Sequence, residues 1–173
     1  MDKYDLIIVG GGAAAFAAAT KANDLGASAL MVNAGLPIGG TCVNVGCVPS
    51  KHLLGLADAL EATRHSAFDS VPLARLNGQF SVRAARNEKD ALVEGLRRRN
   101  YEQVLESLEH VDLREGRGRI VALGKVDVGG EVIEGQHILV ATGSRASIPP
   151  IPGLQEAGYL TNAEAPQLDE APG

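Results

Sequence analysis

Residues 4–15 read Tyr-Asp-Leu-Ile-Ile-Val-Gly-Gly-Gly-Ala-Ala-Ala, and this stretch decides the fold that we expect. An apolar run over Tyr4–Val9 meets three glycines, and an alanine-rich segment then extends to Ala27. A short apolar run, a glycine turn and an alanine-rich segment predict a strand, a tight turn and a helix. Ser28–Val32 is a second apolar run and predicts the next strand.

The glycine turn matches the dinucleotide-binding pattern at Gly10, Gly12 and Ala15. In this pattern Gly10 makes the turn, Gly12 lets the backbone approach a pyrophosphate, and Ala15 lets the helix lie close to the strand. The helix N-terminus then favours the phosphate. A glycine turn without a ligand is the alternative. Asn33 holds the place of the usual acidic ribose ligand, so we expect weaker or altered adenosine binding.

Both cysteines lie in residues 39–51, which read Gly-Gly-Thr-Cys-Val-Asn-Val-Gly-Cys-Val-Pro-Ser-Lys. On a regular helix, Cys42 and Cys47 would lie roughly 8 to 9 Å apart, farther than the about 7 Å that a disulfide allows between Cα atoms. We therefore expect a distorted backbone, with unusual dihedrals at Gly46 and with Pro49 in a first helical turn. Cys47 is better placed than Cys42 at a helix N-terminus, where free amides favour a thiolate.

This cysteine pair could be a structural bridge, half of a metal site or a redox centre. A bridge over so short a loop stabilises by only roughly 2 kcal/mol. His52 and His65 do not form a zinc pattern with the cysteines, and His52 is expected to be an exposed helix residue. The spacing of the two cysteines, the glycines around them and the lysine that follows favour a redox-active pair.

The middle of the chain is predicted to be helical on both sides of a loop. Apolar spacing predicts an amphipathic helix over Lys51–Ala62 and a long helix over Ser81–Glu109, with Tyr101 on its packed face. Pro72 and Gly78 predict that Arg64–Phe80 is a loop.

From Val111 the apolar period changes to two, which predicts strands. Gly129-Gly130 suits a two-residue hairpin turn in a meander, and His137–Ala141 is expected to be a final separate strand that runs into Thr142-Gly143. The meander strands are expected at Ile120–Leu123, Val126–Val128 and Val132–Ile133.

The net charge of −5 argues against a nucleic-acid partner, and the basic run Arg97–Arg99 is expected to be a solvated helix face. We see neither a secretory signal nor a membrane-spanning stretch, so we expect no membrane partner and a cytoplasmic location. A disulfide that survives in a reducing compartment is more often catalytic than structural.

The glycine fingerprint, residues 39–51 and Ala141-Thr142-Gly143 together resemble the flavoprotein disulfide reductases, the pyridine nucleotide-disulfide oxidoreductase family. The wording of residues 43–51 is most similar to mercuric reductases, with dihydrolipoamide dehydrogenases second. The resemblance implies an α/β, Rossmann-like FAD-binding domain, with a parallel sheet, helices and a β-meander. Residues 1–150 would form this domain, and residues 151–173 a connector.

The resemblance also implies a relay from NAD(P)H through FAD to the disulfide and then to a substrate, which we expect to be Hg(II). Cys47 would face the flavin, and Cys42 would be the exposed interchange thiol. Both would bind Hg(II) transiently, and Lys51 would lie near the flavin N5. The expected FAD contacts are Gly10, Gly12, Ala14, Ala15, Asn33, Gly35, Gly40, Thr41, Lys51, Gly118, Thr142 and Gly143.

Family members continue into an NAD(P)H-binding domain and a dimer-forming domain, so we expect this chain to be the N-terminal portion of a larger homodimeric enzyme. Its substrate would be a small molecule or a metal ion. Dihydrolipoamide dehydrogenase activity, or a fragment that binds FAD without turnover, stay open as alternatives.

Overall fold

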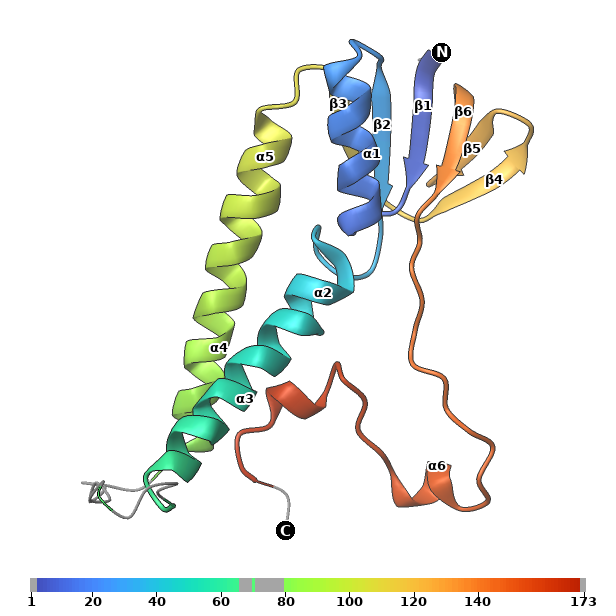
Figure 1. Cartoon of the computed structure of the whole chain (residues 1–173). Helices are drawn as coiled ribbons and strands as arrows, with labels where there is room; N and C mark the ends of the chain where they lie inside the picture. The colour runs from blue at the N-terminus through green and yellow to red at the C-terminus, as the bar shows by residue number, and fades with distance from the viewer. Residues whose placement is uncertain (1–2, 66–69, 71–79, 172–173) are drawn as a thin grey trace. The chain divides into compact units, whose positions relative to one another are not determined.

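The computed structural model describes residues 3–65, 70 and 80–171 (Figure 1). Most of the predicted loop Arg64–Phe80, including Pro72 and Gly78, lies outside the described residues. The chain forms two compact units: Met1–Asn44 with Gly95–Arg145, and Val45–Glu94 with Ala146–Gly173.

The first unit holds a six-stranded sheet in the order β3-β2-β1-β6-β5-β4. β1, β2, β3 and β6 run parallel, whereas β4, β5 and β6 form the predicted antiparallel meander (Figure 1). The strand bounds are β1 Lys3–Val9, β2 Ala29–Asn33, β3 Val111–Glu115, β4 Gly118–Ala122, β5 Lys125–Val128 and β6 Glu131–Val140.

One strand prediction is wrong, because Val132–Ile133 and His137–Ala141 are not separate strands. β6 is continuous from Glu131 to Val140: its first residues pair with β5, and its last residues pair with β1. Gly135, between the two predicted segments, lies within this strand, and a Cβ there would meet Ile7 Cγ1 at 2.7 Å. Gly129-Gly130 makes the predicted hairpin turn between β5 and β6, with φ of 65° and 92°.

The helices expected within residues 13–27, 51–62 and 81–109 are present, whereas the short helices at residues 40–44, 154–157 and 165–167 were not predicted. The first unit contains α1 Ala13–Asp24, α2 Gly40–Asn44, a π-helical turn η1 Arg98–Glu102 and α5 Gln103–Glu106. The second unit contains α3 Cys47–Ala62, most of α4 Val82–Arg97, α6 Leu154–Ala157 and η2 Ala165–Gln167. The predicted helix Ser81–Glu109 therefore corresponds to α4, η1 and α5 in succession.

Alternate residues of β1 point to opposite faces of the sheet and build two cores. Ile8 packs with Phe16 and Ala19 of α1, and the Tyr101 ring meets Phe16 edge-on, with ring centroids 4.9 Å apart. Ile7 and Val9 pack on the other face, in a cluster completed by Leu30, Val32, Val126, Val128 and Ile133. The prediction that Tyr101 packs inward is confirmed.

The basic run is not uniformly solvated. Arg98 and Arg99 are exposed, but the Arg97 side chain is only 24% exposed and bonds to Glu102 and Asn44. Among the described residues, no helix is long and apolar enough to cross a membrane.

Candidate functional site: a glycine-lined cavity

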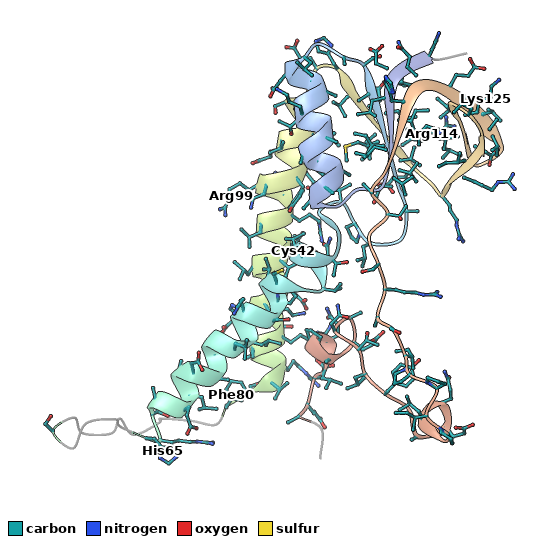
Figure 2. All side chains as sticks on the ribbon, turned by 45° about the vertical axis from the view of Figure 1, so that its right-hand side comes forward. Cys42, His65, Phe80, Arg99, Arg114 and Lys125 are labelled. Atoms are coloured by element: carbon teal, nitrogen blue, oxygen red, sulfur yellow. The ribbon has the colours of Figure 1, made fainter. Side chains whose placement is uncertain are left out.

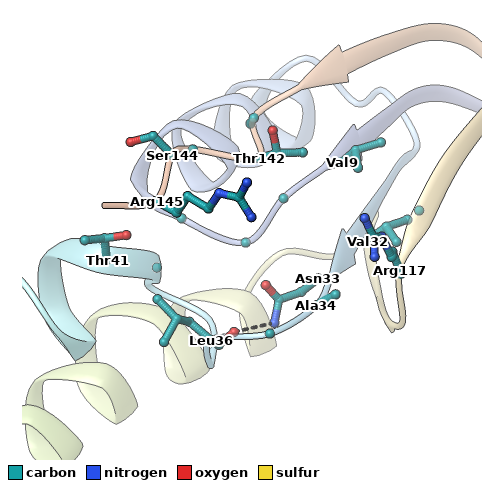
Figure 3. Close-up of a pocket in the computed structure, with 18 of the residues that line it drawn as sticks. Val9, Val32, Asn33, Ala34, Leu36, Thr41, Arg117, Thr142, Ser144 and Arg145 are labelled. Carbon is teal, nitrogen blue, oxygen red and sulfur yellow. Dashed lines mark hydrogen bonds between the residues drawn. The ribbon is translucent and has the colours of Figure 1, made fainter. Parts of the chain in front are cut away.

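A cavity of about 710 Å³ lies in the first unit, where β1, β2 and β6 end (Figure 3). In open α/β sheets, ligands bind in the crevice outside the carboxyl ends of the parallel strands. The predicted cofactor residues among its lining are Gly10, Gly12, Asn33, Gly35, Gly40, Thr41, Gly118, Thr142 and Gly143. Ala14 and Ala15 lie in the first turn of α1, outside the lining.

The glycine turn after β1 is held close to the end of β6. Gly10 N–H donates to the Val32 carbonyl at 2.8 Å, and Ala141 N–H donates to the Val9 carbonyl at 2.8 Å. Gly10 has a φ of 138°, and a Cβ there would lie 2.1 Å from the Ala141 oxygen. Only glycine fits here, which is why the backbone of the turn can border the cavity.

A second glycine turn, Gly39-Gly40, meets the first. Gly39 N–H donates to the Gly11 carbonyl at 2.7 Å, and Gly39 forms an isolated bridge with Gly12. Gly40 has a φ of 62°, and a Cβ there would lie 2.8 Å from Gly12 Cα. The fingerprint and the start of the cysteine motif are therefore in direct backbone contact.

Asn44 was missed by the sequence reasoning, yet it fixes this second turn. Its Nδ2 donates to the carbonyls of Pro37, Ile38 and Gly40 at 3.0, 3.3 and 2.9 Å, and its Oδ1 accepts from Arg97 at 3.2 Å. Asn44 is 8% exposed. No sequence pattern singles out Asn44, because its burial and its partners appear only in the folded chain.

Cys42 lies outside the lining of the cavity, and Cys47 and Lys51 belong to the second unit. Cys42 is exposed on α2, whose first two residues line the cavity, so the first unit places this cysteine one residue beyond the cavity wall (Figure 2). Cys47 is exposed and begins α3 in the second unit, and Lys51 is exposed on the same helix.

The predicted backbone distortion between the cysteines is confirmed. α2 ends at Asn44 and α3 begins at Cys47, with Gly46 at φ −125° and ψ −109°. Pro49 lies in the first turn of α3, as predicted. The helix starts four residues earlier than the predicted Lys51.

The prediction of an exposed His52 is wrong. Its side chain is 22% exposed, and its Nε2 lies 4.0 Å from Glu88 Oε2 of α4, within the second unit. No group of three or more His, Cys, Asp or Glu suited to a metal ion occurs among the described residues.

The cavity suits an anionic ligand. Arg117 and Arg145 contribute to its lining, and the lining residues that the structure describes include no carboxylate (Figure 3). α1 begins at the glycine turn, so its first amides and the positive end of its dipole favour a phosphate there. The volume is in the range of ligand sites, and Gly10, Gly11 and Gly12 line the cavity, where a pyrophosphate can approach their backbone. FAD therefore fits the residues present.

The sheet order and the glycine-lined cavity define a dinucleotide-binding α/β domain. Residues 4–172 match the pyridine nucleotide-disulphide oxidoreductase family, and the chain belongs to this family.

Three comparisons extend this assignment. A mercuric reductase of Lysinibacillus sphaericus is 37% identical over 171 residues, which are 99% of this chain and 31% of that protein. A mercuric reductase of Streptomyces lividans is 39% identical over 98% of this chain and 36% of that protein. The solved HOCl-induced flavoprotein disulfide reductase of Escherichia coli is similar with a TM-score of 0.76 and 26% identity, over 96% of this chain and 34% of that one. The chain thus spans about a third of the length of each of these relatives.

Proposed function

We propose that this chain is the FAD-binding, redox-disulfide segment of an oxidoreductase that uses NAD(P)H to reduce Hg(II) to Hg(0). The observation that carries the proposal is the backbone contact between the two glycine turns, since it joins the cavity to the helix that bears Cys42. The similarity to two mercuric reductases supports the choice of metal ion.

The overall reaction balances as NAD(P)H and Hg²⁺ giving NAD(P)⁺, H⁺ and Hg⁰. Bound FAD would supply the two-electron link between the pyridine nucleotide and the cysteine pair. Gly10 and Gly12 would admit the pyrophosphate, Asn33 would bind the adenosine ribose, and Thr142-Gly143 would close the site. Reduced Cys42 and Cys47 would bind Hg(II), because thiolates are the protein ligands that soft metal ions prefer.

The cysteines are proposed to have unequal roles. Cys47 would be the thiol against the flavin and Cys42 the interchange thiol, with Lys51 near the flavin N5. In the protein that contains this chain, Cys47→Ala is expected to abolish the long-wavelength absorbance that a thiolate–flavin contact produces on reduction, and Cys42→Ala to retain it. Equal spectra for the two variants would contradict the assignment.

The substrate is tested with the full-length protein. Oxidation of NADPH is followed with Hg(II) and, in parallel, with lipoamide. We expect turnover that depends on Hg(II), whereas turnover of lipoamide alone would favour a dihydrolipoamide dehydrogenase. A purified protein that takes up FAD but oxidises NADPH with neither acceptor would favour the non-catalytic alternative.

The remaining features of the proposal concern the whole protein. Residues 1–150 are proposed to belong to the FAD domain and residues 151–173 to lead to a domain that binds NAD(P)H. The protein is proposed to be a cytoplasmic homodimer without a nucleic-acid or membrane partner. Its oligomeric state in solution can be measured by light scattering.

A further inference from the structure

Two adjacent parallel strands of the first unit end side by side next to the cavity. β2 ends at Asn33 and β3 ends at Glu115, and the two residues are register partners. Gly116 N–H donates to the Asn33 carbonyl at 2.8 Å, which fixes this register at the strand ends. A carboxylate is therefore present beside the place where the family fingerprint has one, but on the neighbouring strand.

The hydrogen bonds of Asn33 fix the orientation of its amide. Nδ2 donates to the Leu36 carbonyl at 3.1 Å and to the two carboxylate oxygens of Glu115 at 3.4 and 3.3 Å. An amide nitrogen has two hydrogens and cannot accept, so both neighbours require the nitrogen on this side. Asn33 is 5% exposed, which leaves its side chain little freedom to rotate.

The oxygen of the same amide faces the glycine turn. A Cβ at Gly11 would lie 2.3 Å from Asn33 Oδ1, so this oxygen lies directly against Gly11. Figure 3 shows the Asn33 nitrogen turned toward Leu36 and the oxygen turned away from it. Asn33 and Gly11 both line the cavity, so this amide of fixed orientation forms part of its wall.

We propose that Glu115 is a positioning residue for cofactor recognition, which orients Asn33 so that Oδ1 accepts a hydrogen bond from a ribose hydroxyl of the adenosine half. The inference rests on the proposed binding of FAD. Glu115 is exposed and does not line the cavity, so it acts through the amide. Its negative charge also polarises the amide and strengthens Oδ1 as an acceptor. In this chain the acidic group therefore lies on the neighbouring strand, and it acts on the ribose through the amide of Asn33.

This arrangement predicts that the usual acidic residue would be harmful in this chain. Asn33→Asp replaces the donating nitrogen, which lies 3.3 Å from a Glu115 oxygen, with a second acceptor. Two carboxylates at this separation repel each other. Binding of FAD would require the new carboxylate to stay beside Glu115, so the repulsion would weaken FAD binding. If Glu115 did not act on residue 33, the Asn33→Asp protein would instead bind FAD more tightly, because a carboxylate is the stronger acceptor.

The test is a double-mutant cycle in FAD affinity, measured by quenching of flavin fluorescence in the full-length apoprotein. We expect Asn33→Asp to weaken FAD binding about tenfold, or about 1.4 kcal/mol. Glu115→Gln alone should weaken binding about threefold, because the charge on the amide is lost. Added to Asn33→Asp, the same Glu115→Gln should strengthen binding and return it to within about threefold of wild type.

The decisive result is this reversal of sign for one substitution in two backgrounds. Loss of folding would lower FAD affinity in both backgrounds. The melting temperatures of the wild-type, single-variant and double-variant apoproteins show whether folding is lost. Glu109→Gln, which removes an exposed carboxylate outside the cavity lining, is the matched control and should leave affinity unchanged.

Two kinds of failure can be told apart. Tighter binding by Asn33→Asp, or independent effects of the two substitutions, would overturn the role of Glu115 while FAD binding stands. A wild-type protein that binds no FAD would overturn the proposed function, and this inference with it.

Discussion

Replacing Asn44 should loosen the turn that joins the cavity to the helix of Cys42. Its Nδ2 has two hydrogens, shared among the carbonyls of Pro37, Ile38 and Gly40, and its Oδ1 accepts from Arg97. Asn44→Ala therefore removes about three hydrogen bonds, each with a net value of about 1 kcal/mol. The Pro37 carbonyl keeps a bond from Gly40 N–H at 3.3 Å, so the loss is somewhat smaller.

We expect Asn44→Ala to lower the free energy of unfolding by about 2 to 3 kcal/mol. Asn44→Asp should be at least as harmful, because a carboxylate would face the carbonyl oxygens that now accept from Nδ2. Urea unfolding gives the loss of stability, and hydrogen exchange shows whether the amides of residues 37–47 lose protection first. Asn100→Ala changes an exposed asparagine and serves as the control, within about 0.5 kcal/mol of wild type.

The reasoning would be refuted by an Asn44→Ala protein whose stability falls by less than about 1 kcal/mol while exchange in residues 37–47 is unchanged. That result would mean that the turn is held by its glycines and backbone contacts alone. A loss of stability without faster local exchange would place the effect elsewhere in the chain.

Two further predictions follow from the backbone and from acid titration. Gly40→Ala should lower FAD affinity at least about tenfold, since its Cβ would meet Gly12 Cα at 2.8 Å; Gly129→Ala has a similar φ of 65° with open space around it and should leave affinity unchanged. The backbone N–H and the hydroxyl of Ser28 donate to Asp5 and hold the pKa of that carboxyl below its ordinary 3.8. Because this pKa is lowered, the part of the Ser28→Ala destabilisation that comes from the Asp5 carboxylate should be present above pH 3.8 and shrink as pH falls through the lowered pKa, while the part from the lost Asp5 N–H bond to Ser28 Oγ stays; urea midpoints at pH values above and below 3.8 measure both.

The strands that carry the site were predictable because their signals are local. The apolar run of β1 is followed directly by the glycine turn, and the Gly129-Gly130 pair lies directly between the two strands of its hairpin. β6 was divided in two because Gly135 and its polar neighbours interrupt the apolar pattern. Its place in the sheet depends instead on pairing with β1, more than 120 residues earlier in the chain, as in the register pair Lys3 with Glu134.

The cavity residues of the glycine motifs were predictable from residue type and spacing, whereas their supports were not. Asn44 and Glu115 have no motif of their own. Asn44 is fixed by Arg97, 53 residues away, and Glu115 meets Asn33 across 82 residues. Such pairs arise from strand register and helix placement, which no short pattern encodes. The sequence therefore shows that Asn33 departs from the fingerprint, but the carboxylate of Glu115 beside it is visible only in the fold.

The contact between the two glycine turns explains why the fingerprint and the cysteine motif occur together in one chain. Gly12 ends the first turn and caps α1, while Gly40 ends the second turn and starts α2. A side chain at Gly40 would displace the backbone of Gly12, because its Cβ would lie 2.8 Å from Gly12 Cα. A ligand that orders the first turn should then also order the second, and with it the position of Cys42 two residues later. Cofactor binding and placement of the interchange thiol are thus expected to be coupled: FAD should slow hydrogen exchange in α2 as well as at the start of α1.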